Sequence, residues 1–249
     1  MTKETSLIYG LRPVIEAIRE GRDIDRILIR HGLQGQIYHE LMEEIKAHEI
    51  PYQFVPVEKI DFHTKKNHQG VLAFISLIEY QEINNIVPAI YEKGEEPFII
   101  CLDGVSDVRN FGAIVRSAAC MGAHAIVIPD RGCAGITADA IKTSAGALAG
   151  FPVCRVKSLI KGVNFLKESG LKIVCAEEKN GIIVYKSDLT GPVAVIMGSE
   201  ERGIRKEVLA LADVKVKIPM TGPIGSLNVS VAAGILLYEI SRQRSQANS

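Results

Sequence analysis

The sequence VKIPMTGPIGSLNVSVAAGILLYE, which runs from Val216 to Glu239, decides how the C-terminal half of this chain folds. Its first residues alternate in polarity and predict a strand over Val216–Met220. The glycines and proline of the next segment mark turns, and the apolar residues after Asn228 recur at helical spacing. A glycine-rich loop before a helix exposes backbone N–H groups that suit a polar or anionic ligand. Taken alone, the stretch equally suits an ordinary strand–turn–helix corner.

Upstream of this stretch, apolar strands alternate with helices from Pro97 onward. Continuous apolar runs without a polar face are typical of buried parallel strands, and they occur at Phe98–Leu102, Ala125–Pro129 and Val193–Met197, with Ile173–Ala176 as a further strand. Helical patterns separate them at Phe111–Met121, Ala138–Leu148, Val163–Ser169 and Arg205–Ala212. Repeated strand–helix alternation predicts an α/β fold, a parallel sheet with helices on both faces.

The N-terminal part has a different organisation and predicts a small α/β unit over residues 1–78. Two helices and three strands are expected there, at Pro13–Arg19, Gln36–His48, Ile24–Ile29, Tyr52–Val55 and Val71–Ile78, with a short helix at Val57–Phe62. A basic turn, Lys65–Gly70, precedes the last strand and suits either RNA phosphates or plain solvent. Residues 79–96 are acidic and predict a linker with one helix at Ile83–Tyr91, which belongs either to the linker or to the next domain. The second domain then spans residues 97–249.

Composition limits the classes of protein that this chain can represent. Hydrophobic residues make up 47% of the 249, enough for two domains with sizeable cores. No apolar run approaches the roughly 20 residues that span a bilayer, and the first residues lack the apolar core of a secretion signal. The five cysteines form no close pair, which favours reduced thiols in a cytoplasmic protein over disulfides or a zinc site.

Charge is unevenly distributed along the chain although the formal net charge is zero. Residues 97–249 contain 18 Lys and Arg against 13 Asp and Glu, whereas the part before Pro97 contains 11 against 16. The C-terminal domain therefore carries either a basic face that suits nucleic acid or a chance excess of surface lysine and arginine.

Three loops at predicted strand ends are rich in glycine and polar residues: Asp103–Asn110, Gly198–Gly203 and Thr221–Asn228. Ligands of open α/β sheets bind at the carboxyl ends of strands, so these loops are the candidate site. A dinucleotide-dependent oxidoreductase is disfavoured because GxGxxG does not follow the first strand. A P-loop is excluded because Ile204 stands where its lysine would be. The six histidines lie away from the loops, His124 excepted, so catalysis by a histidine base is not expected.

At these loops the sequence resembles a known family. Asn110–Arg116 (NFGAIVR), Met197–Gly203 (MGSEERG) and Ile218–Ser230 resemble, in order and spacing, the three motifs of the SpoU, or TrmH-like, branch of the SPOUT RNA 2′-O-ribose methyltransferases. The segment Asn67–Val71 (NHQGV) resembles the small L30e-like RNA-binding domain of bacterial 23S rRNA guanosine-2′-O-methyltransferases. One departure is Val108, where the family often has proline.

The resemblance implies a C-terminal trefoil knot that forms a pocket for S-adenosylmethionine. The residues that would bind this cofactor, largely through backbone and apolar contacts, are Met197, Gly198, Ile218, Met220, Leu227 and Val229. Plain core packing is the other interpretation of Ile218 and Leu227.

The resemblance also implies which polar side chains serve the chemistry: Arg116, Asn110, Glu200, Ser226 and Asn228. Arg116, on an otherwise apolar helix face, would engage an RNA phosphate and assist removal of the hydroxyl proton; a salt bridge to Glu200 or Asp107 is the alternative. Asn110 and Asn228 would orient the ribose, although Asn228, like Ser226, is also a residue type that starts helices. Glu200 is either catalytic or structural.

Together these observations predict an enzyme that transfers a methyl group from S-adenosylmethionine to a ribose 2′-hydroxyl of RNA, a guanosine of 23S rRNA in the first instance. A tRNA ribose methyltransferase and a non-catalytic RNA-binding relative are the alternatives, and the intact polar residues favour catalysis. No metal and no membrane are expected. The resemblance also implies a homodimer that pairs through the C-terminal domain and shares the site, and the apolar face of the last helix (Ile235, Leu236 and Ile240) is the expected surface.

Overall fold

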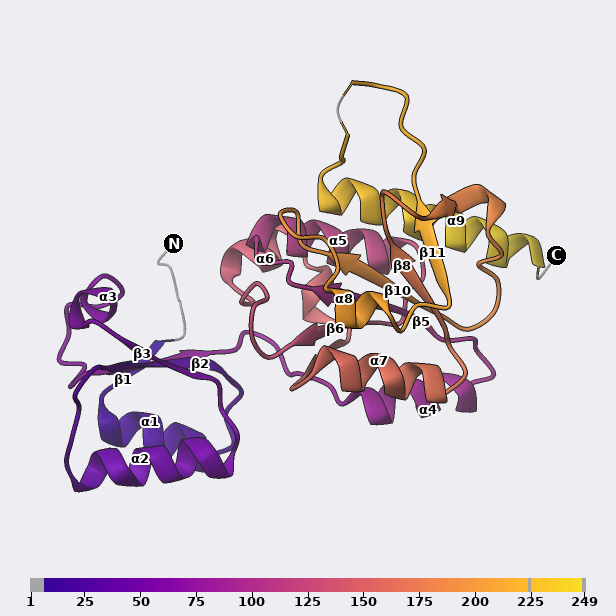
Figure 1. Ribbon diagram of the computed structural model, residues 1–249. Coiled ribbons are helices and arrows are strands. Elements are labelled where there is room, and N and C mark those ends of the chain that lie inside the picture. Colours follow the sequence, from indigo (N-terminus) through magenta and orange to yellow (C-terminus); the bar gives the residue numbers. More distant parts are fainter. Residues whose placement is uncertain (1–6, 224, 248–249) are drawn as a thin grey trace. The chain divides into compact units, whose positions relative to one another are not determined.

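The computed structural model describes residues 7–223 and 225–247, and the chain divides after Glu79 into two compact units (Figure 1). Each unit has its own sheet and its own apolar core. Ile224, in the middle of the predicted glycine-rich loop, lies outside the described residues.

The first unit is a four-stranded sheet with helices on both faces. Along the chain it contains β1 (Leu7–Tyr9), α1 (Leu11–Arg19), β2 (Ile24–Arg30), α2 (Gln36–Ala47), β3 (Tyr52–Val55), α3 (Val57–Asp61) and β4 (Val71–Ile75). The sheet order is β1-β4-β2-β3, and β2 runs parallel to β3 while the other pairs are antiparallel. Helices α1 and α2 bury Val14 and Leu41 against one face, and α3 buries Ile60 against the other.

The second unit is a seven-stranded sheet in the order β7-β6-β5-β10-β8-β11-β9, and every pair in it is parallel. The predicted α/β fold with a parallel sheet is therefore confirmed. Its strands are β5 (Phe98–Asp103), β6 (Ala125–Pro129), β7 (Val153–Val156), β8 (Lys172–Ala176), β9 (Ile182–Ile183), β10 (Val193–Gly198) and β11 (Val214–Lys217). Its helices are α4 (Ile83–Glu92), α5 (Val108–Cys120), α6 (Ala138–Thr143), α7 (Leu159–Glu168), α8 (Lys206–Leu209) and α9 (Val229–Ala247), with 3₁₀ turns at Ala147–Ala149 and Val184–Lys186.

Helices cover both faces of this sheet, with α5 and α9 on one side and α4 and α7 on the other (Figure 1). Helices α4 and α7 pack on alternate residues of the strands, among them Cys101, Cys154 and Cys175. Burial raises the pKa of the Cys154 and Cys175 thiols to about 12, so both stay protonated and inert at neutral pH. Because α4 contributes Val87 and Ile90 to this core, the helix expected near Ile83–Tyr91 belongs to the second unit, which was one of its two interpretations.

Side-chain capping and proline move several element ends from their predicted positions. Helix α5 begins at Val108 rather than Phe111, because the Asp107 carboxylate accepts hydrogen bonds from the N–H groups of Arg109 (2.9 Å) and Asn110 (2.8 Å). The strand predicted at Val216–Met220 is found at Val214–Lys217. Pro219 has no N–H to donate and so cannot extend the ladder.

Other differences lie where backbone conformation interrupts a helical pattern. The helix expected over Ala138–Leu148 ends at Thr143, since Ala145 and Gly146 take positive φ angles of 52° and 85°. Conversely, α7 begins at Leu159, ahead of the predicted Val163, behind the capping residue Ser158. Helix α9 continues past Arg244 to Ala247. No helix in the described ranges is long and apolar enough to cross a membrane.

Candidate active site

The three loops singled out in the sequence follow β5, β10 and β11, all at the carboxyl edge of the parallel sheet. β5 and β10 are neighbours, with Leu102 beside Met197 and Asp103 beside Gly198 in the strand register. In the sheet, β5 has its sequential successor β6 on one side and β10 on the other, so the strand order reverses at β5. A crevice forms at such a switch point in open α/β sheets, and this is where their ligands bind.

Two cavities open at this edge, with volumes of about 760 Å³ and 390 Å³. The larger cavity lies between the ends of β10 and β11 and the start of α9, and the smaller one lies beside the end of β5 and the start of α5. The Ser199–Gly203 loop and Val229 line both cavities. One wall therefore separates two spaces that can each hold a ligand.

The larger cavity is lined by all six residues predicted to bind a cofactor, namely Met197, Gly198, Ile218, Met220, Leu227 and Val229. Leu227 and Met220 keep 38% and 37% of their surface exposed, so they do not form part of the buried core. Ile218 is also only partly buried. Plain core packing therefore does not account for Ile218 and Leu227, and their cofactor contacts stay a prediction.

Gly198 is required by the close approach of two backbone segments. A Cβ on this residue would lie 2.2 Å from the carbonyl carbon of Gly203 and 2.3 Å from the amide nitrogen of Ile204. The loop that follows is closed by two backbone hydrogen bonds between Ser199 and Gly203, of 3.1 Å and 2.9 Å. Any side chain at position 198 would displace this loop, and with it the shared wall of the two cavities.

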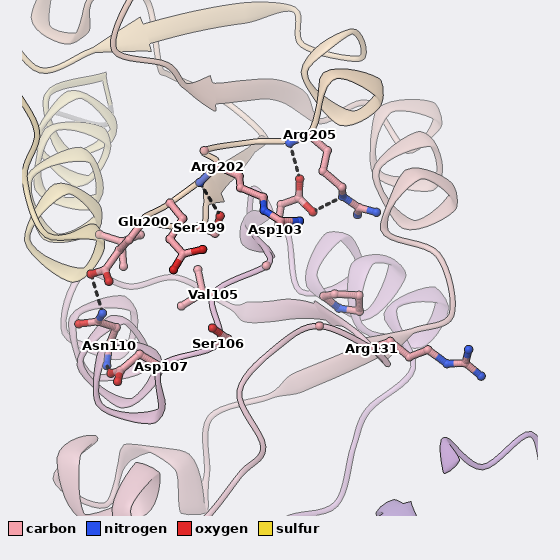
Figure 2. A pocket seen from close by; sticks show the side chains of 16 residues that line it. Asp103, Val105, Ser106, Asp107, Asn110, Arg131, Ser199, Glu200, Arg202 and Arg205 are labelled. Carbon is pink, nitrogen blue, oxygen red and sulfur yellow. Dashed lines mark hydrogen bonds and ion pairs between the residues drawn. The ribbon is translucent and has the colours of Figure 1, made fainter. Parts of the chain in front are cut away.

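A cluster of three side chains joins the three loops. The Asn110 amide donates to Glu200 Oε1 at 2.7 Å, and the Asn228 amide donates to the same oxygen at 2.8 Å and to Asn110 Oδ1 at 3.0 Å. Asn228 Oδ1 in turn accepts from the backbone N–H of Ser230 at 2.9 Å, as a residue at a helix start does. Figure 2 shows Asn110 and Glu200 side by side at one wall of the smaller cavity, joined by this hydrogen bond.

Two other predicted residues are placed differently. Arg116 is exposed on α5, lines neither cavity, and within the described residues forms no ion pair. The alternative of a salt bridge to Glu200 or Asp107 is wrong for the described residues, because Glu200 accepts hydrogen bonds from Asn110 and Asn228 and Asp107 caps α5. Ser226 lines the larger cavity and is exposed to solvent.

No histidine is among the residues that line the two cavities, in keeping with a site that does not use an imidazole base. His124 lies at the opposite edge of the sheet, where its Nδ1 accepts a hydrogen bond from the N–H of Phe98, the first residue of β5. Within residues 7–223 and 225–247 there is no group of three or more His, Cys, Asp or Glu side chains that could hold a metal ion.

The comparisons with known proteins agree with this geometry. The family model described as SpoU rRNA Methylase matches residues 97–238, more than half of the chain. The chain belongs to the SpoU rRNA methylase family. The family predicted from the three motifs is thus confirmed. In this SpoU-family chain, residues 7–81 also match a model described as RNA 2′-O ribose methyltransferase substrate binding.

Similar proteins cover nearly the whole chain. YacO of Bacillus subtilis (strain 168), which carries the name of a TrmH family tRNA/rRNA methyltransferase, is 36% identical over 98% of both chains. The SpoU methyltransferase AviRb of Streptomyces viridochromogenes, whose crystal structure is a complex with the cofactor AdoMet, is 26% identical, with a TM-score of 0.60 over 96% of this chain and 90% of that one. A TrmH/SpoU tRNA modifying enzyme of A. aeolicus is 29% identical, with a TM-score of 0.57 over 66% and 85%.

One positioning pair was missed in the sequence, the ion pair between Asp103 and Arg205. The Asp103 carboxylate, 2% exposed, accepts from the backbone N–H of Arg205 at 2.8 Å and from its Nε at 2.7 Å (Figure 2). The pair ties the end of β5 to the far end of the Ser199–Gly203 loop. The signal was present, since an acidic residue directly ends a fully apolar strand, but its partner lies 102 residues away.

We expect Arg205→Ala in this SpoU-family chain to lower the free energy of unfolding by about 1–3 kcal/mol, between the values of surface and buried pairs. The guanidinium is half exposed, but its loss leaves a buried carboxylate with only a backbone partner. Urea denaturation measures the change. Arg202→Ala is the matched control, because the hydrogen bond of Arg202 in the loop is made by its backbone. Equal stability of both variants would show that the pair contributes nothing.

Proposed function

We propose that this SpoU-family chain is an enzyme that transfers a methyl group from S-adenosylmethionine to a ribose 2′-hydroxyl of RNA. The observation that carries the proposal is the position of the Asn110–Glu200–Asn228 cluster. Asn110 lines the smaller cavity, Asn228 lines the larger one, and Glu200 lines both. The cluster therefore stands at the boundary between the two cavities. Transfer of a group between two bound molecules requires that donor and acceptor meet at such a boundary, with the reacting atoms in line.

The larger cavity fits the cofactor. Its lining combines apolar side chains such as Met197 and Leu236 with the backbone of Gly198 and with polar side chains, as an adenosine with an amino-acid tail requires. The close backbone approach at Gly198 leaves no room for a side chain between the loop and the end of β10. When bound, S-adenosylmethionine would supply a methyl group activated on a positively charged sulfur.

The chain's own residues then have three tasks. The Asn110–Glu200–Asn228 cluster holds the three loops in register, and Asn110 lies where it can orient a ribose in the smaller cavity. As the bond from the hydroxyl oxygen to the methyl carbon formed, the bond from that carbon to sulfur would break to leave a neutral thioether, and the hydroxyl proton would pass to water. Arg116 is the proposed residue that binds an RNA phosphate and assists this loss.

Arg116 lies outside both cavities of its own chain, and we propose that it serves the site of a second copy. Helix α9 packs beside α5 and presents Val231, Ile235 and Tyr238 to solvent, with 50%, 38% and 57% of their surfaces exposed. These residues, the α9 stripe, are spaced to lie along one side of the helix. Of the residues expected at the dimer surface, Leu236 and Ile240 are instead buried in their own unit, at 2% and 0% exposure. We propose a homodimer through the α9 stripe.

For this dimer we expect light scattering at micromolar concentration to give twice the 27.2 kDa mass of one chain. Ile235→Asp places a charge in the α9 stripe and is expected to give monomers with methyl transfer at least ~100-fold lower, because the site loses its arginine. Ile182→Asp, at a residue 55% exposed on β9, is the control and should stay dimeric. A monomeric wild type would contradict the proposal.

The proposed substrate is a guanosine of 23S rRNA. Support comes from the match of residues 7–81 to a substrate-binding model and from the rRNA methylase description of the family that matches the second unit. A tRNA is the second candidate, since YacO carries a tRNA/rRNA name and the A. aeolicus relative is described as tRNA modifying.

The decisive experiment incubates the purified chain with methyl-labelled S-adenosylmethionine and either rRNA or tRNA. A 2′-O-methyl group blocks alkaline cleavage of the next phosphodiester, so the label should appear in an alkali-resistant dinucleotide that begins with guanosine from rRNA. If the label appears in tRNA instead, tRNA replaces 23S rRNA as the proposed substrate. Label on a base, or in neither RNA, would overturn the proposed function. Calorimetry with S-adenosylmethionine and with NAD separates a methyltransferase from an oxidoreductase.

A further inference from the structure

One face of the first unit carries aromatic rings and cationic side chains that alternate across the surface. α3 covers this face only in part, over Leu28 and Leu72. Beside it lie the six residues that we call the aromatic–basic patch: Tyr9, Arg26, Phe62, His63, Lys66 and Phe74. They come from three strands and from the segment after α3, so the fold rather than the local sequence brings them together.

The distances show that rings and cations of the patch are in contact. The Arg26 guanidinium carbon lies 4.5 Å from the centre of the Phe74 ring, and the Lys66 ammonium lies 5.7 Å from that of Tyr9. The His63 ring meets Phe74 edge to face at 5.0 Å between centroids, and Phe62 at 5.5 Å. Burial, together with nearby Arg26 and Lys59, lowers the pKa of His63, which therefore acts as a neutral ring at neutral pH.

Phe62 is the residue of the patch whose side chain is mostly exposed to solvent. It is 85% exposed, more than any other large hydrophobic side chain among the described residues. Leaving a phenyl ring in water forgoes the favourable free energy of burying its apolar surface. Around it, Lys59, Lys65 and Lys66 are exposed, and the Asp61 carboxylate is occupied by His68 at 2.9 Å. A ligand that covers Phe62 would therefore meet flat apolar rings edged by positive charge.

We propose that the aromatic–basic patch binds unpaired RNA, with one base stacked on Phe62 and the backbone phosphates beside Arg26, Lys59 and Lys66. This rests on the proposed function and adds to it the form of RNA that the first unit recognises. In an A-form duplex the bases are stacked on each other and closed to side chains, whereas bases in loops are free to stack on aromatic residues. Alternating rings and cations are the arrangement that proteins use for single strands.

The test compares two RNA probes on the full-length chain without methyl donor. One is a hairpin whose loop contains 2-aminopurine, a base that loses fluorescence on stacking; the other is a blunt duplex with the same stem. We expect Phe62→Ala to weaken hairpin binding about tenfold and to abolish the quenching, while duplex binding changes less than about twofold. Phe62→Tyr should keep both properties of the wild type.

The matched control is Phe54→Ala. Phe54 is 40% exposed. It lies two residues from Tyr52 in the same strand and therefore on the same face of the sheet, the α1–α2 face, which is opposite to the patch. The Phe54→Ala variant should therefore bind the hairpin within about twofold of the wild type. Hairpin binding and quenching that are unchanged in Phe62→Ala would overturn the proposal, as would equal losses for hairpin and duplex. If either of these results is obtained and the wild type still methylates RNA, the proposed binding surface is wrong and the proposed function stands. If it binds the hairpin through Phe62 but methylates no RNA, the proposed function fails instead.

Discussion

Gly198→Ala is expected to abolish cofactor binding and to lower methyl transfer at least ~100-fold, the loss typical of a site displaced by about 1 Å. The new Cβ would lie 2.2 Å from the carbonyl carbon of Gly203, closer than non-bonded atoms approach, and backbone cannot rotate away as a side chain can. The Ser199–Gly203 loop would have to move. Asp103 holds the far end of this loop in place through Arg205, so the part of the loop that moves would be the wall shared by both cavities.

Isothermal calorimetry with S-adenosylmethionine measures the first effect, and a methyl-transfer assay measures the second. Gly150→Ala is the matched control, since a Cβ there meets no atom within 4 Å and its φ is negative, at −136°. Circular dichroism must show that the Gly198 variant keeps its secondary structure, as a misfolded chain would also lose the ligand. A folded Gly198→Ala variant with wild-type affinity would remove this loop from the cofactor site.

Arg116→Ala should abolish methyl transfer while changing the affinity for S-adenosylmethionine by no more than a few-fold. Arg116 is exposed, forms no ion pair in the described part of the chain, and lines neither cavity, so its loss disturbs neither the fold nor the cofactor pocket. The free energy of unfolding should change by less than about 0.5 kcal/mol. A large loss of activity without loss of stability is the expected signature of a residue that acts on the substrate.

A single-turnover assay with excess enzyme isolates the chemical step from product release. Lys161→Ala removes the same charge from an exposed position on α7, across the sheet from α5, and should keep nearly full activity. If the Arg116 and Lys161 variants transfer methyl groups at the same rate, the arginine has no part in the reaction. Mixing inactive Arg116→Ala with inactive Gly198→Ala chains should restore activity if the site is shared between two copies.

The three site loops could be located from the sequence because the signals for them are local. Continuous apolar runs identified the buried strands β5 and β10, and glycine-rich segments identified the loops after them. Parallel strands end at one edge of a sheet, so Asn110, Gly198 and Leu227 were expected near each other. The structure brings their loops together, and Asn110 is hydrogen-bonded to Glu200 and to Asn228. The trefoil knot stays a prediction.

The family, the parallel α/β fold and the loops that form the two cavities could thus be predicted from the amino-acid sequence. Four features became visible only in the folded chain: the Asp103–Arg205 pair, the exposure of Arg116, the burial of Leu236 and Ile240, and the aromatic–basic patch. The difference lies in the range of the interactions. Strand periodicity and turn chemistry act within a few residues, whereas these contacts depend on the order of strands in each sheet and on which face each helix buries, and both are set by packing between segments distant in the chain.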